Sequence, residues 1–416
     1  MKIAFCSIGS RGDIQPFLEL GRKAAVRGHQ VKVVSAGMYQ SLADDFGVAY
    51  EAFEGDYAAL VDDEQMKKMI GKNPFTMRQK LREKVYPVLE SSLHKFYEVA
   101  QWADALVYHP KTLIDSFGQQ MPHKLMKAYV VPAFTPTAAF RNPLLEFLPL
   151  PSFLNKFSYR ITNFLMGTVG EPIRNFQKKH QIQQSSNWLE TPAIYGVSPS
   201  LIERPADYPA DHLFTGLWLS PPQTQAPLPS AWTEFLSQKI PTLVITFGSM
   251  PYQAKTPIKD FIQALIKSFD LQVLLVRGWG LKDAEIPQHE RVLAIERVPF
   301  DQLFPLADYV MHHGGAGTTA TALQAGLPQM ICPVLHPLGD QYWWGKQLAR
   351  KALGVRPVPL KKLTISSLKK GVHELIATHW TEPQRLKEVI EAEHGLEKAV
   401  DLIESSFGPR AQNLAN

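Results

Sequence analysis

The stretch ADYVMHHGGAGTTATALQAGLPQMICPV, residues 307–334, contains the clearest structural pattern in the chain. An apolar run ends at two histidines, His312 and His313, and a glycine-rich turn follows. The next residues, from Thr318 to about Gly326, predict a helix, and QMICPV is another apolar run. A strand, a glycine-rich turn, a helix and a strand in this order predict an α/β fold with a parallel sheet.

The glycine-rich turn itself, residues 314–317, has the composition of an anion-binding site. Glycines let the backbone approach an anion closely, and the free amides and dipole at a helix start favour negative charge. The turn is neither a P-loop nor a Gly-x-Gly-x-x-Gly dinucleotide fingerprint. His313, just before the glycines, could donate a hydrogen bond to a phosphate oxygen. This histidine and the pair Thr318 and Thr319 favour a diphosphate site over a turn of purely topological origin.

The alternation of strands and helices continues on both sides of this stretch. Strands are expected at residues 2–8, 30–36, 104–110, 128–134, 241–250, 271–280 and 291–298, and helices at 14–29 and 258–269. Each half of the chain is therefore expected to contain a doubly wound parallel sheet. Between the halves, residues 218–232 are rich in proline and lack a hydrophobic period, which predicts an extended linker.

Composition limits the classes of function. The 416 residues are enough for two domains, and 45% hydrophobic residues are enough for two cores. A net charge of +5 without a long Lys/Arg run argues against nucleic acid as the main partner. Cys6 and Cys332 both fall in apolar runs, which is typical of buried thiols in a reducing compartment. Because no export signal or transmembrane stretch is visible, a cytoplasmic location is expected.

Residues 142–182 interrupt the α/β alternation with a segment rich in Leu, Phe and Pro that also carries Lys156 and Arg160. Three interpretations are open: a packed pair of helices, the lining of an apolar pocket, or an amphipathic segment in peripheral contact with a membrane. Periodicity alone does not separate them.

Longer motifs reveal a family resemblance. The block HHGGAGTTATALQAGLPQMICPVLHPLGDQYWWG, residues 312–345, resembles the donor-site signature of family-1, UDP-sugar-dependent glycosyltransferases. The branch it resembles most is shared by sterol glucosyltransferases and glycopeptide-antibiotic glycosyltransferases. Further matches, in the expected order, are GSRGDIQPFLELGRKAAVRGHQV (9–31), TPTAAFRNP (135–143), FGSMP (247–251), RGWG (277–280) and VPFDQLFPLADYVMHHGGAGT (298–318).

The resemblance implies the GT-B fold, in which two facing doubly wound Rossmann-like domains enclose a cleft. Residues 1–217 would bind the acceptor and residues 233–390 the nucleotide sugar, with 218–232 as the linker. A helix within residues 391–416 would cross back to the first domain. The implied activity is transfer of a hexose, glucose being the first choice, from a UDP-sugar to a hydroxyl with inversion of configuration.

The resemblance also assigns donor contacts. The residues assigned to the diphosphate are His313, Gly315, Ala316, Gly317, Thr318, Gly248 and Ser249. Val298 lies where the family reads the uracil base through its backbone. Plant members place a stacking tryptophan there, and Trp279 or Arg277 could compensate for its absence in this chain.

Asp340 and Gln341 stand at an expected helix start. Asp340 could be a simple N-cap, but an Asp-Gln pair also suits sugar hydroxyls, because the carboxylate accepts hydrogen bonds and the amide both donates and accepts. With the glycine-rich turn just upstream, we expect the pair to bind the sugar, as the resemblance also implies.

Asp13 is the candidate general base. A carboxylate at a strand end that faces a cleft can remove the proton of an attacking hydroxyl. The resembled branch is taken to use this aspartate directly, whereas other members use a histidine that is absent from this loop. Capping of the following helix is the alternative, and the two roles are compatible. On the acceptor side, the candidates are His109, Thr137 and Phe140, although a lone histidine after a strand is more often structural.

No metal or other cofactor is expected. The chain has no Asp-x-Asp motif, and the helix start, His313 and Ser249 would meet the charge that develops on the leaving group. Two alternative functions remain: a UDP-sugar 2-epimerase of the same fold, and a nucleotide-sugar-binding module without turnover. The apolar sequence between 135 and 182 argues against the epimerase and favours a hydrophobic acceptor, while Asp13 argues against the module.

Overall fold

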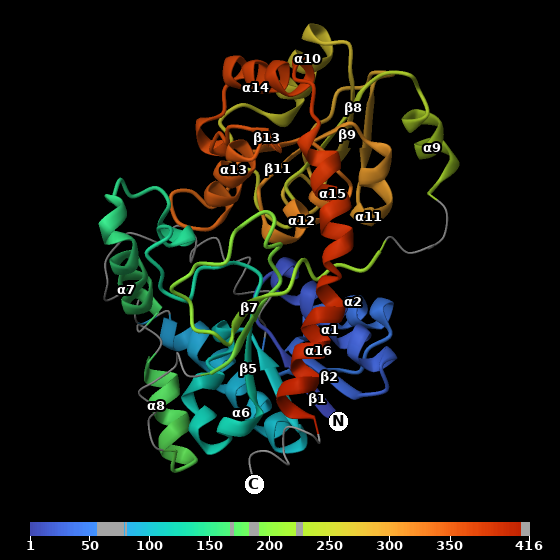
Figure 1. Ribbon diagram of the computed structural model, residues 1–416. Coiled ribbons are helices and arrows are strands. Elements are labelled where there is room, and N and C mark those ends of the chain that lie inside the picture. Colours follow the sequence, from blue (N-terminus) through green and yellow to red (C-terminus); the bar gives the residue numbers. More distant parts are fainter. Residues whose placement is uncertain (56–78, 80, 167–169, 183–190, 222–227, 409–416) are drawn as a thin grey trace.

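The computed structural model describes residues 1–55, 79, 81–166, 170–182, 191–221 and 228–408. Within these residues the chain forms two lobes, each built around a parallel sheet that is covered by helices (Figure 1). The edge strands Tyr50–Phe53 and Val292–Ile295 are mostly only partly buried, whereas the central strands are largely buried, as in KIAFC of the first strand and TLVIT of the eighth. Such continuous apolar runs are expected where helices cover both faces of a parallel sheet.

The N-terminal lobe has a seven-stranded sheet in the order β3-β2-β1-β4-β5-β6-β7. Its strands are β1 (Lys2–Cys6), β2 (Gln30–Ala36), β3 (Tyr50–Phe53), β4 (Ala105–Tyr108), β5 (Leu125–Tyr129), β6 (Ala193–Tyr195) and β7 (His212–Phe214). Its helices are α1 (Arg11–Val26), α2 (Gln40–Phe46), α6 (Tyr86–Trp102), α7 (Asn155–Met166) and α8 (Gly170–Lys179). The strand order reverses between β1 and β4, so their carboxyl ends flank a topological switch point.

The C-terminal lobe repeats this plan with a six-stranded sheet in the order β10-β9-β8-β11-β12-β13. Its strands are β8 (Thr242–Thr246), β9 (Gln272–Val276), β10 (Val292–Ile295), β11 (Tyr309–His312), β12 (Gln329–Ile331) and β13 (Gly354–Val355). Its helices are α9 (Ser230–Leu236), α10 (Ile258–Ser268), α11 (Phe300–Leu303), α12 (Ala316–Gln324), α13 (Gln341–Arg350), α14 (Ile365–Ala377) and α15 (Glu382–Glu393). Here the switch point lies between β8 and β11.

The two lobes share an apolar interface. Tyr129 and Tyr195 of the first lobe belong to the same buried cluster as Leu323 and Trp343 of the second. Beside this cluster, the ring of Phe140 lies 5.8 Å from that of Trp343. The relative position of the lobes is therefore set by side-chain packing as well as by the chain connections.

The last helix, α16 (Gly395–Phe407), leaves the C-terminal lobe and packs on α1 of the N-terminal lobe (Figure 1). It begins after His394, whose φ of 50° separates it from α15. Lys23 forms an ion pair with Glu397 at 2.5 Å, and Arg27 forms one with Glu404 at 2.8 Å. These contacts tie the end of the described chain to the first lobe.

Several expected boundaries are wrong. The strands expected to reach residues 250 and 280 end at Thr246 and Val276, and the helix expected from Thr318 begins at Ala316. The first helix starts at Arg11 rather than at residue 14, because Ser10 and Asp13 cap it one turn earlier. The strand expected at 128–134 is β5, which ends at Tyr129, before Pro132. The expected extended linker ends early, since α9 begins at Ser230; residues 222–227 of that linker lie outside the described residues, as do 409–416 of the expected C-terminal segment.

The insertion at 142–182 is helical, with α7 and α8 as its main elements, and residues 167–169 lie outside the described part. Each helix buries aromatic side chains, Tyr159 at 1% exposed and Phe176 at 2%. The described residues therefore agree with the interpretation as packed helices. Phe153 and Phe157, however, remain 82% and 50% exposed at the start of the insertion.

Candidate active site

Asp13 lies beyond the carboxyl end of β1, in the first turn of α1. Its Oδ2 atom accepts hydrogen bonds from the Ser10 backbone N–H at 2.8 Å and from the Ser10 hydroxyl at 3.0 Å. A β-carbon at position 9 would overlap this oxygen, so Gly9, with a φ of 145°, leaves it room. One carboxylate oxygen of Asp13 therefore caps the helix, which confirms the capping interpretation for that oxygen.

Lys111 binds the other oxygen of Asp13. Its Nζ lies 2.6 Å from Oδ1, and the two residues are 98 positions apart in the sequence. Lys111 follows β4, the neighbour of β1, in a short turn where its N–H donates to Nδ1 of His109 at 3.1 Å. Sequence analysis missed this lysine. Its position after the strand on the other side of the switch point was the available signal.

The charges around Asp13 fix its protonation state. Burial alone would raise the pKa of Asp13, but the charge and hydrogen bond of Lys111 outweigh burial and hold that pKa below its usual value. Burial, assisted by Lys111, lowers the pKa of His109 to about 3. At neutral pH the N-terminal switch point therefore presents a carboxylate, an ammonium group and a neutral imidazole.

The two histidines at the end of β11, His312 in the strand and His313 just after it, have different surroundings. His312 is fully buried, with Nε2 2.8 Å from the side-chain oxygen of Gln329 and Nδ1 accepting the N–H of Gly314 at 3.1 Å. His313 is 8% exposed, and its buried Nδ1 has no hydrogen-bond partner among the described residues. Burial, and then His312, lower the pKa of His313 to about 3. His312 thus stabilises the turn, while His313 is a neutral imidazole with hydrogen-bonding capacity left for a ligand.

The glycines around His313 create space for its ring. A β-carbon on Gly315 would overlap Nε2 of His313, and one on Gly248 would lie 3.3 Å from Cε1 of the same ring. Gly248 also has a φ of 59°, in the left-handed region that favours glycine. Ser249 follows it and is exposed in the turn after β8. The turns after β8 and β11 therefore meet around the His313 ring.

The helix after the glycine-rich turn, α12, starts at Ala316, so its first free amides belong to the residues assigned to the diphosphate. Its first turn contains no acidic residue. Gly317 and Thr318 are partly exposed there, and the buried hydroxyl of Thr319 has no partner among the described residues. A helix start with open amides is a ready anion site, which agrees in geometry with the predicted diphosphate site.

The switch points of the two lobes face each other. The Cα of Gly12, next to Asp13, lies 3.7 Å from the position that a β-carbon on Gly317 would take. The starts of α1 and α12 therefore converge from opposite lobes. Asp340 completes this group, since Lys111 and Asp13 both act on its pKa.

Asp340 and Gln341 open α13, as expected. The Asp340 side chain makes no capping bond but accepts the indole N–H of Trp344 at 3.0 Å. Burial raises the pKa of Asp340, and Lys111 opposes that rise. Gln341 is 2% exposed, and its side-chain oxygen accepts two backbone N–H groups, those of Val334 and Leu335, each at 2.8 Å. Both acceptor positions of that oxygen are thus used, which leaves only the amide NH₂ of Gln341 for a sugar.

The residues assigned to the base differ in availability. Val298 packs partly buried against the apolar cluster of the C-terminal lobe. The guanidinium of Arg277 donates to the carbonyls of Leu281, Lys282 and Ala284, so it holds that loop. Trp279 is 42% exposed and is the side chain of the three with an accessible aromatic face.

The acceptor-side candidates are mostly structural in this geometry. His109 is 2% exposed among aromatic rings, including Phe134 at 5.3 Å. Thr137 is fully buried, and its hydroxyl donates to Asp207 at 2.6 Å. Phe140 is the candidate that is partly exposed, and its ring contacts Trp343 of the other lobe.

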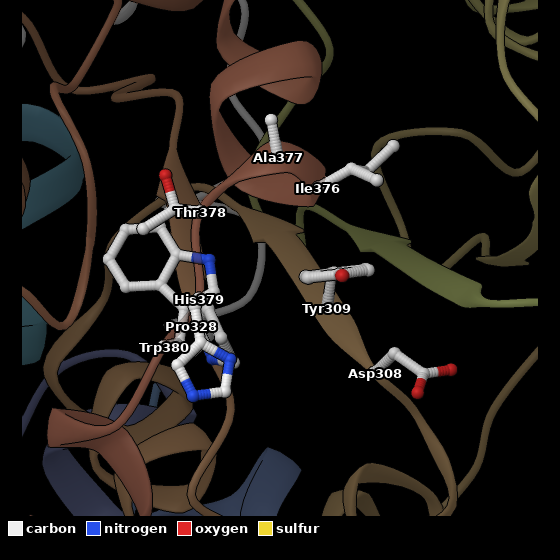
Figure 2. Close-up of a pocket in the computed structure, with 8 residues that line it drawn as sticks. All are labelled: Asp308, Tyr309, Pro328, Ile376, Ala377, Thr378, His379 and Trp380. Atoms are coloured by element: carbon white, nitrogen blue, oxygen red, sulfur yellow. The ribbon is translucent and has the colours of Figure 1, made fainter.

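A separate hollow of about 440 Å³ lies at the opposite end of the second sheet (Figure 2). Asp308, Tyr309 and Pro328, at the amino ends of β11 and β12, line it together with residues at the end of α14, including His379 and Trp380. It is therefore not part of the facing switch points. Across the described residues, no group of three or more His, Cys, Asp and Glu side chains is arranged to hold a metal ion.

Comparison with known families agrees with this geometry. Residues 3–106 match the glycosyltransferase family 28 N-terminal domain, and residues 266–395 match the C-terminal domain of erythromycin biosynthesis protein CIII-like. The structure is similar to a glycosyltransferase of kitacinnamycin, with a TM-score of 0.70, 17% identity and 98% of both chains covered. The chain is thus a glycosyltransferase with the GT-B fold, as the sequence predicted.

Its similar relatives define the branch more narrowly. The chain is 27% identical to a sterol 3-beta-glucosyltransferase of Arabidopsis thaliana over 98% of this chain and 68% of that protein. It is 28% identical to a sterol 3-beta-glucosyltransferase of Yarrowia lipolytica, over 91% of this chain and 27% of the relative. An O-mycaminosyltylonolide 6-deoxyallosyltransferase of Streptomyces fradiae is 27% identical over 97% of both chains. The resemblance to the branch that contains sterol glucosyltransferases is confirmed, and the antibiotic relative is a macrolide rather than a glycopeptide glycosyltransferase.

Proposed function

We propose that this protein transfers a hexose from a UDP-sugar to a hydroxyl of a hydrophobic acceptor, with inversion at the anomeric carbon. The observation that carries the proposal is the approach of the two switch points, with a carboxylate on one and an anion cradle on the other. General-base catalysis needs the first group, and a departing diphosphate needs the second.

In the proposed reaction, the acceptor hydroxyl attacks the anomeric carbon and gives its proton to Asp13. The new bond from the acceptor oxygen to carbon forms while the bond from that carbon to the diphosphate oxygen breaks, and its electron pair leaves with UDP. The start of α12, His313 and Ser249 would stabilise the charge that develops on the diphosphate. This arrangement of fixed dipoles requires no metal ion in the proposal.

For the donor, Trp279 is the proposed stacking partner of the base, and Asp340 with the Gln341 amide is the proposed sugar contact. The sterol relatives are named glucosyltransferases, which supports glucose. One structural neighbour was solved with dTDP, so thymidine donors belong in any test of base preference. The two free buried cysteines support a cytoplasmic location as part of the proposal.

For the acceptor, the names of the sterol and tylonolide relatives support a bulky hydrophobic alcohol. The proposal includes a peripheral membrane contact through the exposed Phe153 and Phe157, beside the cations Lys156 and Arg160. No helix of the described residues is long and apolar enough to cross a bilayer. Co-sedimentation with anionic vesicles tests this contact. Binding by the unaltered protein that is lost in Phe153→Ser supports it. Equal binding by both proteins, or no binding by the unaltered protein, argues against it.

A matrix of donors and acceptors tests the function. Purified protein is incubated with UDP-glucose, other UDP-hexoses or dTDP-glucose and with sterols or macrolide aglycones, and products are read by mass spectrometry. UDP release that depends on an alcohol, with a product one hexose heavier, supports transfer. UDP release without acceptor and with an epimerised sugar would instead reveal the epimerase, and tight UDP binding without turnover would reveal a binding module.

A further inference from the structure

The two oxygens of Asp13 have different partners, and this difference divides their roles. Oδ2 accepts two hydrogen bonds from Ser10, one from its N–H and one from its hydroxyl. Those bonds fill its acceptor positions and fix it to the start of α1. Among the described residues, Oδ1 accepts one hydrogen bond, from the ammonium of Lys111 at 2.6 Å, so it retains a lone pair for an incoming hydroxyl.

The backbone of Lys111 is held rigidly. Its N–H donates to His109 Nδ1 at 3.1 Å, and the Thr112 hydroxyl donates to the His109 carbonyl at 2.7 Å. His109 is in turn wedged among aromatic rings, with Phe17 and Tyr129 at 6.5 and 6.2 Å. The side chain of Lys111 is nevertheless 41% exposed, although its ammonium is desolvated where it meets Asp13.

Lys111 also acts on a carboxylate of the other lobe. Burial lowers the pKa of Lys111, but Asp13 and then Asp340 outweigh burial and raise it. The charged groups near Asp13 are therefore Lys111 from the turn after β4 and Asp340 from the start of α13, with the neutral imidazole of His109 beside them. Because His109 is neutral, the positive charge of Lys111 is what offsets the repulsion between the carboxylates of Asp13 and Asp340.

We propose that Lys111 is the positioning residue of the catalytic base, which it orients through Oδ1 and keeps ionised while Asp340 binds the sugar. This inference rests on the proposed function. In the transfer step, the proton of the acceptor hydroxyl moves to the free lone pair of Oδ1 as the acceptor oxygen bonds to the anomeric carbon and UDP leaves. Asp13 is then neutral.

The ammonium of Lys111 has two opposing effects on Asp13: it weakens the carboxylate as a base, and it extends to lower pH the range in which the carboxylate is ionised. A carboxylate next to an ammonium is a weaker base, but it stays ionised to lower pH. Removing the ammonium should therefore move the acidic limb of the pH profile upward, toward the value that burial alone would impose on Asp13. A neighbouring cation typically lowers such a pKa by about 1–3 units, which sets the size of the expected shift.

The test compares the unaltered protein with Lys111→Met, which keeps the length of the stem, and with Lys111→Arg, which keeps the charge. The pH dependence of kcat/KM for the acceptor is measured together with UDP affinity and thermal stability. Lys178→Met, on the exposed end of α8, is the control. In Lys111→Met we expect the midpoint of the acidic limb to shift to higher pH by about one unit or more. In Lys111→Arg the midpoint should lie close to that of the unaltered protein, and UDP affinity should be unchanged in both variants.

A second measurement separates this inference from the proposed function. Carbon-13 labelling of aspartate carboxyls gives an NMR titration of Asp13, assigned by its disappearance in Asp13→Asn. An upward shift of that titration in Lys111→Met supports the inference even if no acceptor is ever glycosylated, in which case only the proposed function fails. A titration and an acidic limb that both stay in place in Lys111→Met overturn it, whatever happens to the rate.

Discussion

In the N-terminal lobe the turns after the two central strands carry charged side chains, whereas in the C-terminal lobe the turns after the equivalent strands carry glycines and a neutral histidine. Asp13 and Lys111 form an ion pair after β1 and β4. Gly248 and Gly315 instead make room for His313 after β8 and β11. The two switch points are topologically equivalent, yet one offers groups that titrate and the other offers dipoles that do not.

The difference follows from what each half has to do. Proton transfer needs a side chain whose charge can change, and its pKa must be tuned by neighbours. Holding a diphosphate needs donors that keep their orientation as charge develops, and backbone amides at a helix start meet that need at any pH. The same fold can therefore carry both functions when only the residues after two strands differ.

The largest effect is expected from removal of the titrating group. In Asp13→Asn, the amide oxygen can still accept the Ser10 N–H, so the start of α1 should remain capped. The base is lost, and turnover should fall by roughly 10²–10⁴-fold with UDP affinity unchanged. Initial rates of UDP release and calorimetric binding of UDP measure the two quantities.

Asp44→Asn is the matched control, because Asp44 is exposed on α2 and its side chain accepts a hydrogen bond from Gln40. It should leave the rate unchanged. A rate in Asp13→Asn within a factor of about three of the unaltered protein would remove Asp13 from the chemistry, since a general base is worth far more.

A smaller effect is expected from a change at the C-terminal switch point, where His313 is neutral. His313→Ala removes the buried imidazole, whose predicted bond to the diphosphate is of the charge-assisted kind, worth about 1.5–3 kcal/mol. UDP affinity should therefore fall by about 10–150-fold, as measured by calorimetry. The residual turnover at saturating donor should keep the acidic limb of the unaltered protein, because that limb belongs to Asp13.

His379→Ala is the control for this prediction, since His379 lines the separate hollow at the other end of the same sheet (Figure 2). UDP affinity should not respond to it. The opposite result, with His379→Ala weakening UDP and His313→Ala leaving it intact, would move the nucleotide to that hollow and end the comparison between the switch points.

The comparison also explains what the sequence could predict. The C-terminal site is local: the strand, the histidines, the glycines and the helix start occupy residues 309–324 without interruption. A local pattern is visible in one dimension, and so are the apolar runs of both sheets. The capping role of Asp13 is local too, because its partner Ser10 is three residues away.

The N-terminal site depends on contacts that are distant in sequence. Lys111 and Asp13 are 98 residues apart and meet only because β4 pairs with β1. The use of the Gln341 oxygen by Val334 and Leu335 was equally invisible, since it depends on the path of a loop. Residue type predicts what a side chain can do, but neighbours decide which of its atoms are still free to do it.

The smallest effect is expected from a change at Asp340, whose charge interacts with Lys111 and Asp13 of the other lobe. Asp340→Asn should keep the bond from the Trp344 indole, because an amide oxygen can accept it. What it loses is the charge that strengthens a bond to a sugar hydroxyl, a difference of about 1–1.5 kcal/mol. The affinity for UDP-glucose should fall by about tenfold while the affinity for UDP alone stays the same. Asp270→Asn, at an exposed ion pair with Arg291, should change neither affinity. Equal losses of affinity for UDP and UDP-glucose in Asp340→Asn would mean that Asp340 supports the diphosphate turn instead of the sugar. The charged N-terminal switch point and the uncharged C-terminal switch point would then both act at the phosphates.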